Sequence, residues 1–177
     1  MTMSHPARTS TILVRPAKVE DVPLILGLIR ELALYERAPD AVLATEAQLE
    51  RQLFGEGFGR GPTAECLIGE AEGAGQGFAL YCMNFSTWLG RPGVWLEDLF
   101  VRPAFRGCGL GAALFRAVAA VAIERDCGRM EWSVLDWNEP AIDFYRRQGA
   151  IALSEWTTHR LEGAALRKVV TSTPCRR

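Results

Sequence analysis

The 177-residue sequence has little of what marks several large classes of protein. Its 20 Lys and Arg residues are balanced by 21 Asp and Glu residues, giving a formal net charge of −1. Such a balance gives no electrostatic reason to expect a nucleic-acid partner. The apolar runs are also short, because a stretch such as 117–123 is far below the roughly 20 residues that cross a bilayer. We therefore expect no nucleic-acid partner and no membrane-spanning helix.

Cysteine and histidine are too scattered to indicate a metal site or a disulfide framework. Five cysteines is an odd number, and they show no close spacing typical of metal or redox pairs. They are Cys66, Cys82, Cys108, Cys127 and Cys175. The two histidines, His5 and His159, lie far apart in the sequence, so we expect no bound metal. This pattern favours a reducing, cytoplasmic location.

What is present is the composition of one folded domain. Apolar residues make up 49% of the chain and charged residues 23%, which is typical of globular proteins. The length suits a single domain with a substantial core. We expect a flexible leader at 1–11, which lacks the apolar segment of a signal peptide, a single domain at 12–171 and a tail at 172–177.

Hydrophobic spacing and turn residues predict a succession of strands and helices. A strand at 12–15 is followed by apolar residues at helical spacing after Asp21, and Thr45 with Gln48 forms a capping-box pattern that opens a second helix. Further strands are predicted at 66–70 and 77–85, which form an antiparallel hairpin, and at 94–101, 130–135, 151–157 and 160–169. A long helix is predicted from 110 until Gly128, and a short one between Asn138 and Gly149.

The segment 106–111, Arg-Gly-Cys-Gly-Leu-Gly, joins a predicted strand to the long helix. Glycines let a backbone approach an anion closely, and the N–H groups at a helix N-terminus supply donors and a positive dipole end. A pyrophosphate suits such a loop, although the same glycines also suit a plain tight turn. The loop lacks the Lys-Ser/Thr ending of a P-loop and follows a late strand, which disfavours nucleoside triphosphate and Rossmann-type sites.

Arg106, Gly109 and Gly111 match the Gln/Arg-x-x-Gly-x-Gly/Ala signature of the GNAT superfamily of N-acetyltransferases, which the chain resembles over about residues 12–162. The segments that carry the likeness to its spermidine/spermine (diamine) acetyltransferase branch are 15–17, 29–36, 95–101 and 137–145. The segment 134–138 looks more like the thialysine acetyltransferases of that branch. The resemblance implies an α/β fold with a mixed, mostly antiparallel sheet, flanked by helices and splayed at the strand before the glycine loop.

The resemblance also implies acetyl-CoA as co-substrate and assigns residues to it. The residues that would bind it are Leu99, Phe100, Val101, Arg106, Gly107, Cys108, Gly109, Leu110, Gly111, Ala112, Asn138, Glu139, Pro140 and Ala141. In this set, 99–101 would pair with the pantetheine and 107–112 would hold the pyrophosphate. Cys108 is expected to be a small filler and not a nucleophile.

Acyl transfer to an amine needs a neutral nucleophile and a proton for the departing thiolate. By spacing alone, a core aromatic is the favoured explanation of Tyr145. The resemblance reverses this and implies Tyr145 as general acid, with Glu97 as a water-mediated base. Glu97 and Asp98 point to opposite faces of a regular strand, so both can face one cleft only if a bulge intervenes. The residues implied to bind the amine are Tyr35, Glu36, Glu97, Glu131, Trp132 and Ser133.

The function predicted from these residues is acetyl transfer to a primary amine of a small cationic molecule. A polyamine or diamine and a thialysine-like amino acid both remain open as substrates. Two alternatives also stay open: a non-catalytic acyl-CoA-binding module, and an acetyltransferase for a protein or peptide amine. The resemblance further implies a homodimer, with the apolar C-terminal strands as the contact.

Overall fold

The computed structural model describes residues 11–57 and 61–171. These fall into two compact units, of which the first ends at Ser133 and the second begins at Val134. The predicted leader and tail lie outside the described residues, apart from Thr11, and the single domain at 12–171 stays a prediction. Among the helices of the described segments, none is long and apolar enough to cross a membrane.

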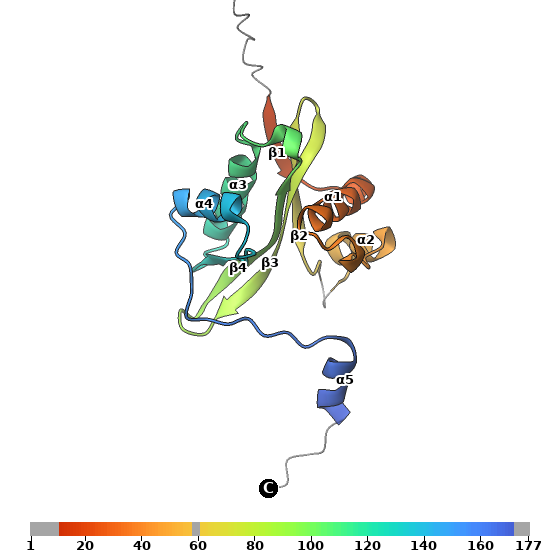
Figure 1. The fold of residues 1–177 in the computed structure, drawn as a ribbon, viewed down its shortest axis with the longest axis vertical. Coiled ribbons are helices and arrows are strands. Elements are labelled where there is room, and N and C mark those ends of the chain that lie inside the picture. Colours follow the sequence, from red (N-terminus) through yellow and green to blue (C-terminus); the bar gives the residue numbers. More distant parts are fainter. Residues whose placement is uncertain (1–10, 58–60, 172–177) are drawn as a thin grey trace, which may run out of the picture. The chain divides into compact units, whose positions relative to one another are not determined.

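A five-stranded sheet forms the centre of the first unit (Figure 1), with the strands in the order β1-β2-β3-β4-β5. The strands are β1 (Ile12–Pro16), β2 (Glu65–Ala71), β3 (Ala74–Ser86), β4 (Arg91–Val101) and β5 (Met130–Glu131). The first four pair antiparallel in sequence order, and β5 pairs parallel with β4. This is the mixed, mostly antiparallel sheet that was predicted, including the hairpin of β2 and β3.

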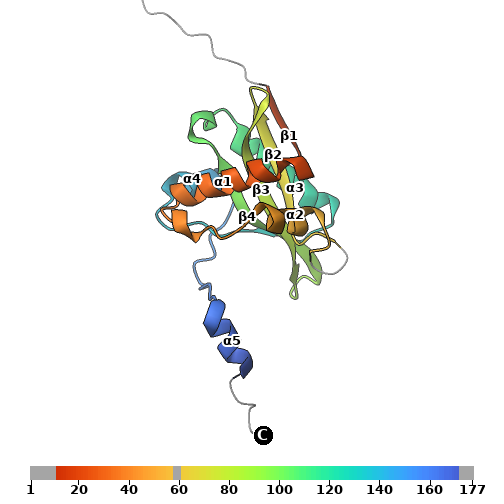
Figure 2. The ribbon, with the colours of Figure 1, turned by 90° about the vertical axis from the view of Figure 1, so that its right-hand side faces the viewer.

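Helices cover both faces of this sheet. Helices α1 (Val22–Tyr35) and α2 (Glu46–Phe54) lie on one face and α3 (Leu110–Glu124) on the other, as Figures 1 and 2 show. We call these the α1 side and the α3 side. The α1 side is built on one buried cluster: Ile25, Leu28, Leu53, Cys66, Ile68, Phe78 and Phe100. Leu110 and Leu114 of α3 lie over Gly69 on the other face, where a side chain would collide with both leucines.

The helix boundaries follow local sequence signals, with one correction. Thr45 and Gln48 form the predicted capping box at the start of α2. Helix α3, however, ends at Glu124 and not at Gly128. Asp126 takes the left-handed conformation, with φ of 54°, and ends the helix before the glycine is reached. Aspartate is one of the few residues besides glycine that adopts this region readily, so it can replace the glycine signal.

The strand predicted at 130–135 is shorter than expected. Only Met130 and Glu131 pair with β4, opposite Val94 and Trp95. Beyond this pair, the described strand pairings leave the far edge of β4 open up to Val101, the residue that leads into the glycine loop. The sheet is therefore splayed where the resemblance implies.

The second unit contains helices α4 (Glu139–Arg147) and α5 (Gly163–Thr171). The prediction of closing strands at 151–157 and 160–169 is wrong. Ala165, Leu166 and Val169 recur at helical spacing, and the chain follows this period, so the second segment is mostly helix. The first segment is coil, because the described part of the second unit offers no strand with which it could form a ladder.

Candidate active site

The glycine loop enters α3 in a conformation that exposes backbone donors. Gly109 is the N-cap of α3 and has φ of 97°, in the left-handed region that favours glycine. The N–H of Ala113 makes a 2.9 Å bond to the Gly109 carbonyl. The N–H groups of residues 110–112 precede this first turn of bonds, so they are the orphan donors of the helix. With the helix dipole, they fit the pyrophosphate of the implied co-substrate.

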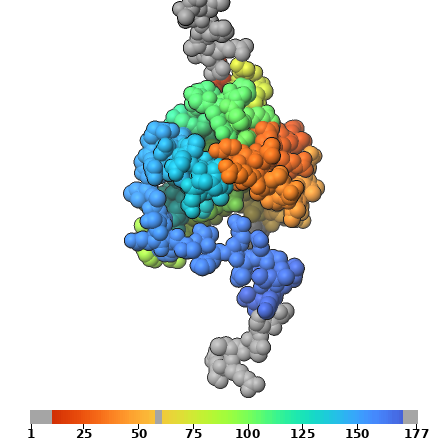
Figure 3. Space-filling model, in the orientation of Figure 1, coloured from red at the N-terminus to blue at the C-terminus, as the bar shows by residue number. Residues whose placement is uncertain are grey.

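Arg106 anchors this loop to the rest of the first unit. Its Nε donates to the Val101 carbonyl at 2.9 Å, and its guanidinium lies over the rings of Tyr35, 4.5 Å from the centroid, and Phe100, at 5.6 Å. In Figure 3 the green surface of the loop accordingly adjoins the orange surface at the end of α1. The family signature arginine thus holds the loop, the end of β4 and α1 together.

The open edge of β4 lies next to this loop. Phe100 and Val101 are buried in the core, and Leu99 is half-buried. Their backbone is paired with β3 on one side, and no described strand pairs with them on the other. Backbone N–H and C=O groups at an unpaired edge are suited to an extended ligand chain. The predicted pantetheine contact at 99–101 is compatible with this edge and stays a prediction.

A β-bulge at Glu97 changes how the carboxylates of β4 are displayed. Leu80 pairs with Asp98 and Tyr81 pairs with Leu96, so Glu97 is an extra residue in the ladder. Cross-strand partners share a face of a sheet, and Leu80 packs against the buried cluster on the α1 side. Asp98 therefore faces α1, while Leu96 faces α3 with Tyr81.

Glu97 lies on the α1 side as well. Trp95 pairs with Cys82, two residues from Leu80 and so on the same face, and the indole Nε1 of Trp95 donates to Glu97 Oε2 at 2.7 Å. The charge of Glu97 also adds to the burial that raises the pKa of the Cys82 thiol. The bulge thus places Glu97 and Asp98 on the same side of the sheet, as the sequence analysis required for both to act together. No residue type in the segment 95–101 signals the extra residue.

Three carboxyl groups gather on this side of the sheet. Glu36 follows the last residue of α1, and its pKa is raised by burial. The pKa of Asp98 is raised to about 7, first by burial and then by the charges of Glu97 and Glu36. Like charges held together at low solvation favour protonation or a bound cation. The resemblance favours Glu97 over Asp98, whereas in the structure Asp98 is the half-buried acid of β4 and its pKa is raised.

The remaining predicted amine-binding residues differ in their partners. Glu131 forms a 2.7 Å ion pair with Arg129 and accepts a 3.1 Å hydrogen bond from Asn84. Trp132 packs edge-on against Phe115 of α3, with ring centroids 5.3 Å apart. Such partners are what strand packing alone would provide. The roles assigned to Glu131, Trp132 and Ser133 stay predictions.

The second unit carries the predicted acid and the rest of the predicted co-substrate residues. Asn138 caps α4, its Oδ1 accepting from the Ala141 N–H at 3.4 Å, and Pro140 lies in the first turn. Gly149 has φ of 87° just beyond the helix, as predicted. Tyr145 is half-buried on α4, with its ring edge-on to Phe144 at 5.2 Å. Its role as general acid stays a prediction.

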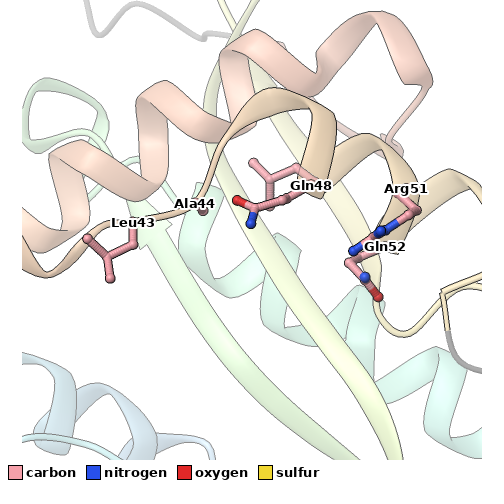
Figure 4. Close-up of a pocket in the computed structure, with 6 residues that line it drawn as sticks. Leu43, Ala44, Gln48, Arg51 and Gln52 are labelled. Atoms are coloured by element: carbon pink, nitrogen blue, oxygen red, sulfur yellow. The ribbon is translucent and has the colours of Figure 1, made fainter. Parts of the chain in front are cut away.

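A separate hollow lies on α2 and the segment before it (Figure 4). It has a volume of about 360 Å³ and is lined by Leu43, Ala44, Gln48, Leu49, Arg51 and Gln52. None of these six residues belongs to the predicted site. The hollow is therefore unrelated to the glycine loop and the carboxyl groups.

Comparison with known proteins decides the family. Residues 29–150 match the acetyltransferase (GNAT) family. The chain belongs to this family. A thialysine N-epsilon-acetyltransferase of Sus scrofa is 40% identical to this acetyltransferase over 171 residues, covering 90% of this chain and 98% of that protein. A spermidine/spermine N(1)-acetyltransferase-like protein 1 of Homo sapiens is 36% identical over 148 residues, covering 80% and 21%.

The fold of this acetyltransferase agrees with solved structures. An integron cassette protein from the mobile metagenome of V. cholerae aligns with a TM-score of 0.74 and 27% identity, covering 91% of this chain and 98% of that one. The predicted family, branch and fold are thus confirmed. The protein is an N-acetyltransferase of a family that uses acetyl-CoA, which removes the alternative of a non-catalytic binding module.

Proposed function

We propose that this enzyme transfers the acetyl group of acetyl-CoA to a primary amine of a small cationic molecule. The acceptor class is a diamine or polyamine, or an amino acid of the thialysine type. The observation that carries the proposal is the group of Glu36, Glu97 and Asp98 on the α1 side of β4, the strand that leads into the glycine loop. A cationic amine is the ligand that relieves the repulsion within such a group.

The chain's own residues divide the work of the reaction. The N–H groups of 110–112 would hold the pyrophosphate, and the open edge of β4 would align the pantetheine. In the family pattern, Glu97 removes the amine's proton through a water and Tyr145 protonates the departing thiolate. When bound, acetyl-CoA supplies a thioester carbonyl activated for attack by nitrogen.

We also propose a homodimer in a reducing cytoplasm. Large apolar side chains of the second unit are exposed, among them Ile151, 86% exposed, and Trp156, 70% exposed. Large apolar side chains left exposed support a subunit contact. The cysteines that the structure describes, Cys66, Cys82, Cys108 and Cys127, are free thiols, which suits a reducing compartment.

The test is the release of free thiol from acetyl-CoA with a panel of acceptors. Spermidine, putrescine, lysine and thialysine represent the proposed class, and a lysine-containing peptide represents the alternative. We expect release with at least one of the four small amines at a kcat/KM well above that for the peptide. Preference for the peptide, or no release with any small amine, would contradict the proposal.

A further inference from the structure

A cluster of polar side chains lies on the α1 side of the sheet, at the end of β4 away from the glycine loop. Trp95 pairs with Glu131 of β5, and Gly93 pairs with Asn84 of β3, so these residues share the face that carries Glu97. Asn84 Nδ2 donates to Glu131 Oε2 at 3.1 Å. The polar cluster and the carboxyl groups of the candidate site therefore lie on one face of the sheet.

Arg129 brings a cation to this cluster. Its Nε lies 2.7 Å from Glu131 Oε2, and its Nη1 donates to the Ser86 hydroxyl at 2.9 Å. Gly93 makes room for it, because an added Cβ would lie 3.2 Å from Arg129 Cγ and would collide with the amide oxygen of Asn84. The guanidinium is therefore held in a fixed orientation above the start of β4.

The ion pair of Arg129 and Glu131 keeps polar atoms available to a ligand. The two side chains are 37% and 26% exposed, so a small molecule can reach both. Nε of Arg129 pairs with Glu131 by charge without an aligned hydrogen bond, and within the described segments the guanidinium donates only from Nη1, which leaves Nη2. Both described partners of Glu131 lie at Oε2, which leaves Oε1.

We propose that the pair of Arg129 and Glu131 selects an α-amino acid as the acceptor over a diamine of the same chain length. Arg129 binds the α-carboxylate and Glu131 the α-ammonium, while the side-chain amine lies at Glu97. This inference rests on the proposed function and concerns the distal end of the same site. A zwitterionic head group matches both charges of an ion pair, whereas the distal ammonium of a diamine matches the carboxylate and opposes the guanidinium.

Trp95 provides the surface between the two ends of this site. It lies directly across from Glu131, and its indole Nε1 donates to Glu97 Oε2 at 2.7 Å. Glu131 and Glu97 are thus diagonal neighbours, which lie roughly 7–8 Å apart in a sheet. A lysine side chain spans about 6 Å from its α-carbon to its terminal nitrogen, since it has five extended bonds of about 1.5 Å. Its methylene groups then pack along the indole.

The first experiment uses the unaltered enzyme and acceptors that differ by one group. Lysine and cadaverine differ only in the α-carboxylate, as do ornithine and putrescine. We expect kcat/KM for the amino acid to exceed that for its decarboxylated counterpart by at least tenfold, the scale of hydrogen bonds between charged groups. Lysine amide, which lacks the negative charge, should fall to the level of cadaverine. A diamine that equals or exceeds its amino acid would overturn the assignment.

The second experiment removes the cation. Arg129→Gln should lower kcat/KM for lysine by about 10- to 100-fold, mainly through KM, and should leave the value for cadaverine unchanged or higher. Arg129→Lys should keep part of the preference, because the charge remains and the planar fork is lost. A merely structural role would instead lower the activity with both acceptors alike, and that result would contradict the proposal.

Arg125→Gln is the matched control. Arg125 forms a comparably exposed ion pair with Glu65, but Glu65 pairs with Tyr81, which lies on the α3 side. The variant therefore loses an arginine–glutamate pair without changing the α1 side, and we expect the preference for lysine to stay. The comparison of acceptors on the wild type still decides the matter if Arg129→Gln does not fold.

The outcomes also separate this assignment from the proposed function. Equal turnover of lysine and cadaverine, unchanged in Arg129→Gln, would overturn the role of the ion pair and leave the amine acetyltransferase intact. A wild-type enzyme that releases thiol with no small amine would overturn the function, and the assignment with it.

Discussion

At the scale of single residues, the raised pKa of Asp98 has a consequence for stability that is independent of catalysis. The folded pKa of about 7 lies above the ordinary value of 3.8, so between these pH values the folded state binds more protons than the unfolded state. The free energy of unfolding should therefore fall as the pH rises from about 4 to 7. The cost of the ionised carboxylate is absent below this window and fully present above it.

Asp98→Asn should remove most of this pH dependence. The variant should be more stable than the wild type at pH 8, by at most about 4 kcal/mol and by less where water reaches the carboxyl. Thermal unfolding from pH 5 to pH 8 measures the effect, with the exposed Glu50→Gln on α2 as the control. Parallel curves for Asp98→Asn and the wild type would show that Asp98 ionises in the folded state as freely as in water.

Tyr145 carries the second prediction for a single residue. Tyr145→Phe removes only the hydroxyl, so we expect turnover to fall by roughly ten- to ten-thousandfold with little change in CoA affinity. The neighbouring ring of Phe144 should keep its edge-on contact, and the fold should survive. Steady-state kinetics and CoA titration measure the two effects. A fully active variant would assign Tyr145 to packing alone.

The candidate site could be predicted only where residue type and spacing carry the information. The glycine loop, the N-cap Asn138 and the acidic pair at 97 and 98 are visible in the sequence. The face of the sheet that each acid takes cannot be read from the sequence. It depends on one extra residue in the β4 ladder, and no residue type marks that bulge here. The bracing of the loop by Arg106 and Tyr35 joins residues far apart in the sequence, and only the fold brings them together.

At the scale of elements, the N-terminus of α3 is the feature that most directly tests co-substrate binding. Gly109 has φ of 97°, and a β-branched side chain is strained in that region. Gly109→Val should therefore distort the first turn and weaken CoA binding by at least tenfold. Isothermal titration with CoA measures the change.

Gly73, in the turn between β2 and β3, is the matched control for that variant. It also has positive φ, at 77°, and no atom lies within 4 Å of an added Cβ, so Gly73→Val carries a similar backbone strain away from the loop. We expect it to lower the melting temperature without changing CoA affinity. Equal CoA affinity in the Gly109→Val variant and the wild type would exclude the loop as the anion site.

Elements with strong local signals were predictable, and those that depend on partners were not. The capping box of α2 and the hairpin of β2 and β3 needed only neighbouring residues. The length of β5 depends on how far β4 stays beside it, which no local pattern records. The segment of helix α5 is predicted as a strand because its apolar run is short, and a run of that length does not by itself distinguish a strand from a helix.

At the scale of the whole molecule, the exposed apolar residues of the second unit predict self-association. We expect a homodimer at micromolar concentration, measured by light scattering or sedimentation. The double variant Ile151→Ser/Trp156→Ser should shift the protein towards the monomer, because it removes apolar area that the contact would bury. Leu43→Ser, at a residue of the first unit that is 85% exposed, is the control and should leave the mass unchanged. A monomeric wild type would contradict the prediction.

The bulge in β4 also bears on how this strand can change in length. Leu96 and Asp98 pair with adjacent residues of β3. A chain lacking residue 97 would therefore form a regular ladder, in which all the remaining side chains of β4 keep their present faces. Loss of any other single residue from the middle of the strand, with the bulge retained, would instead move the side chains on one side of the deletion to the opposite face of the sheet. Glu97 therefore occupies the one place in β4 where a residue can be gained or lost without disturbing the core. An acidic group at this position can be acquired by insertion, at almost no cost to the fold.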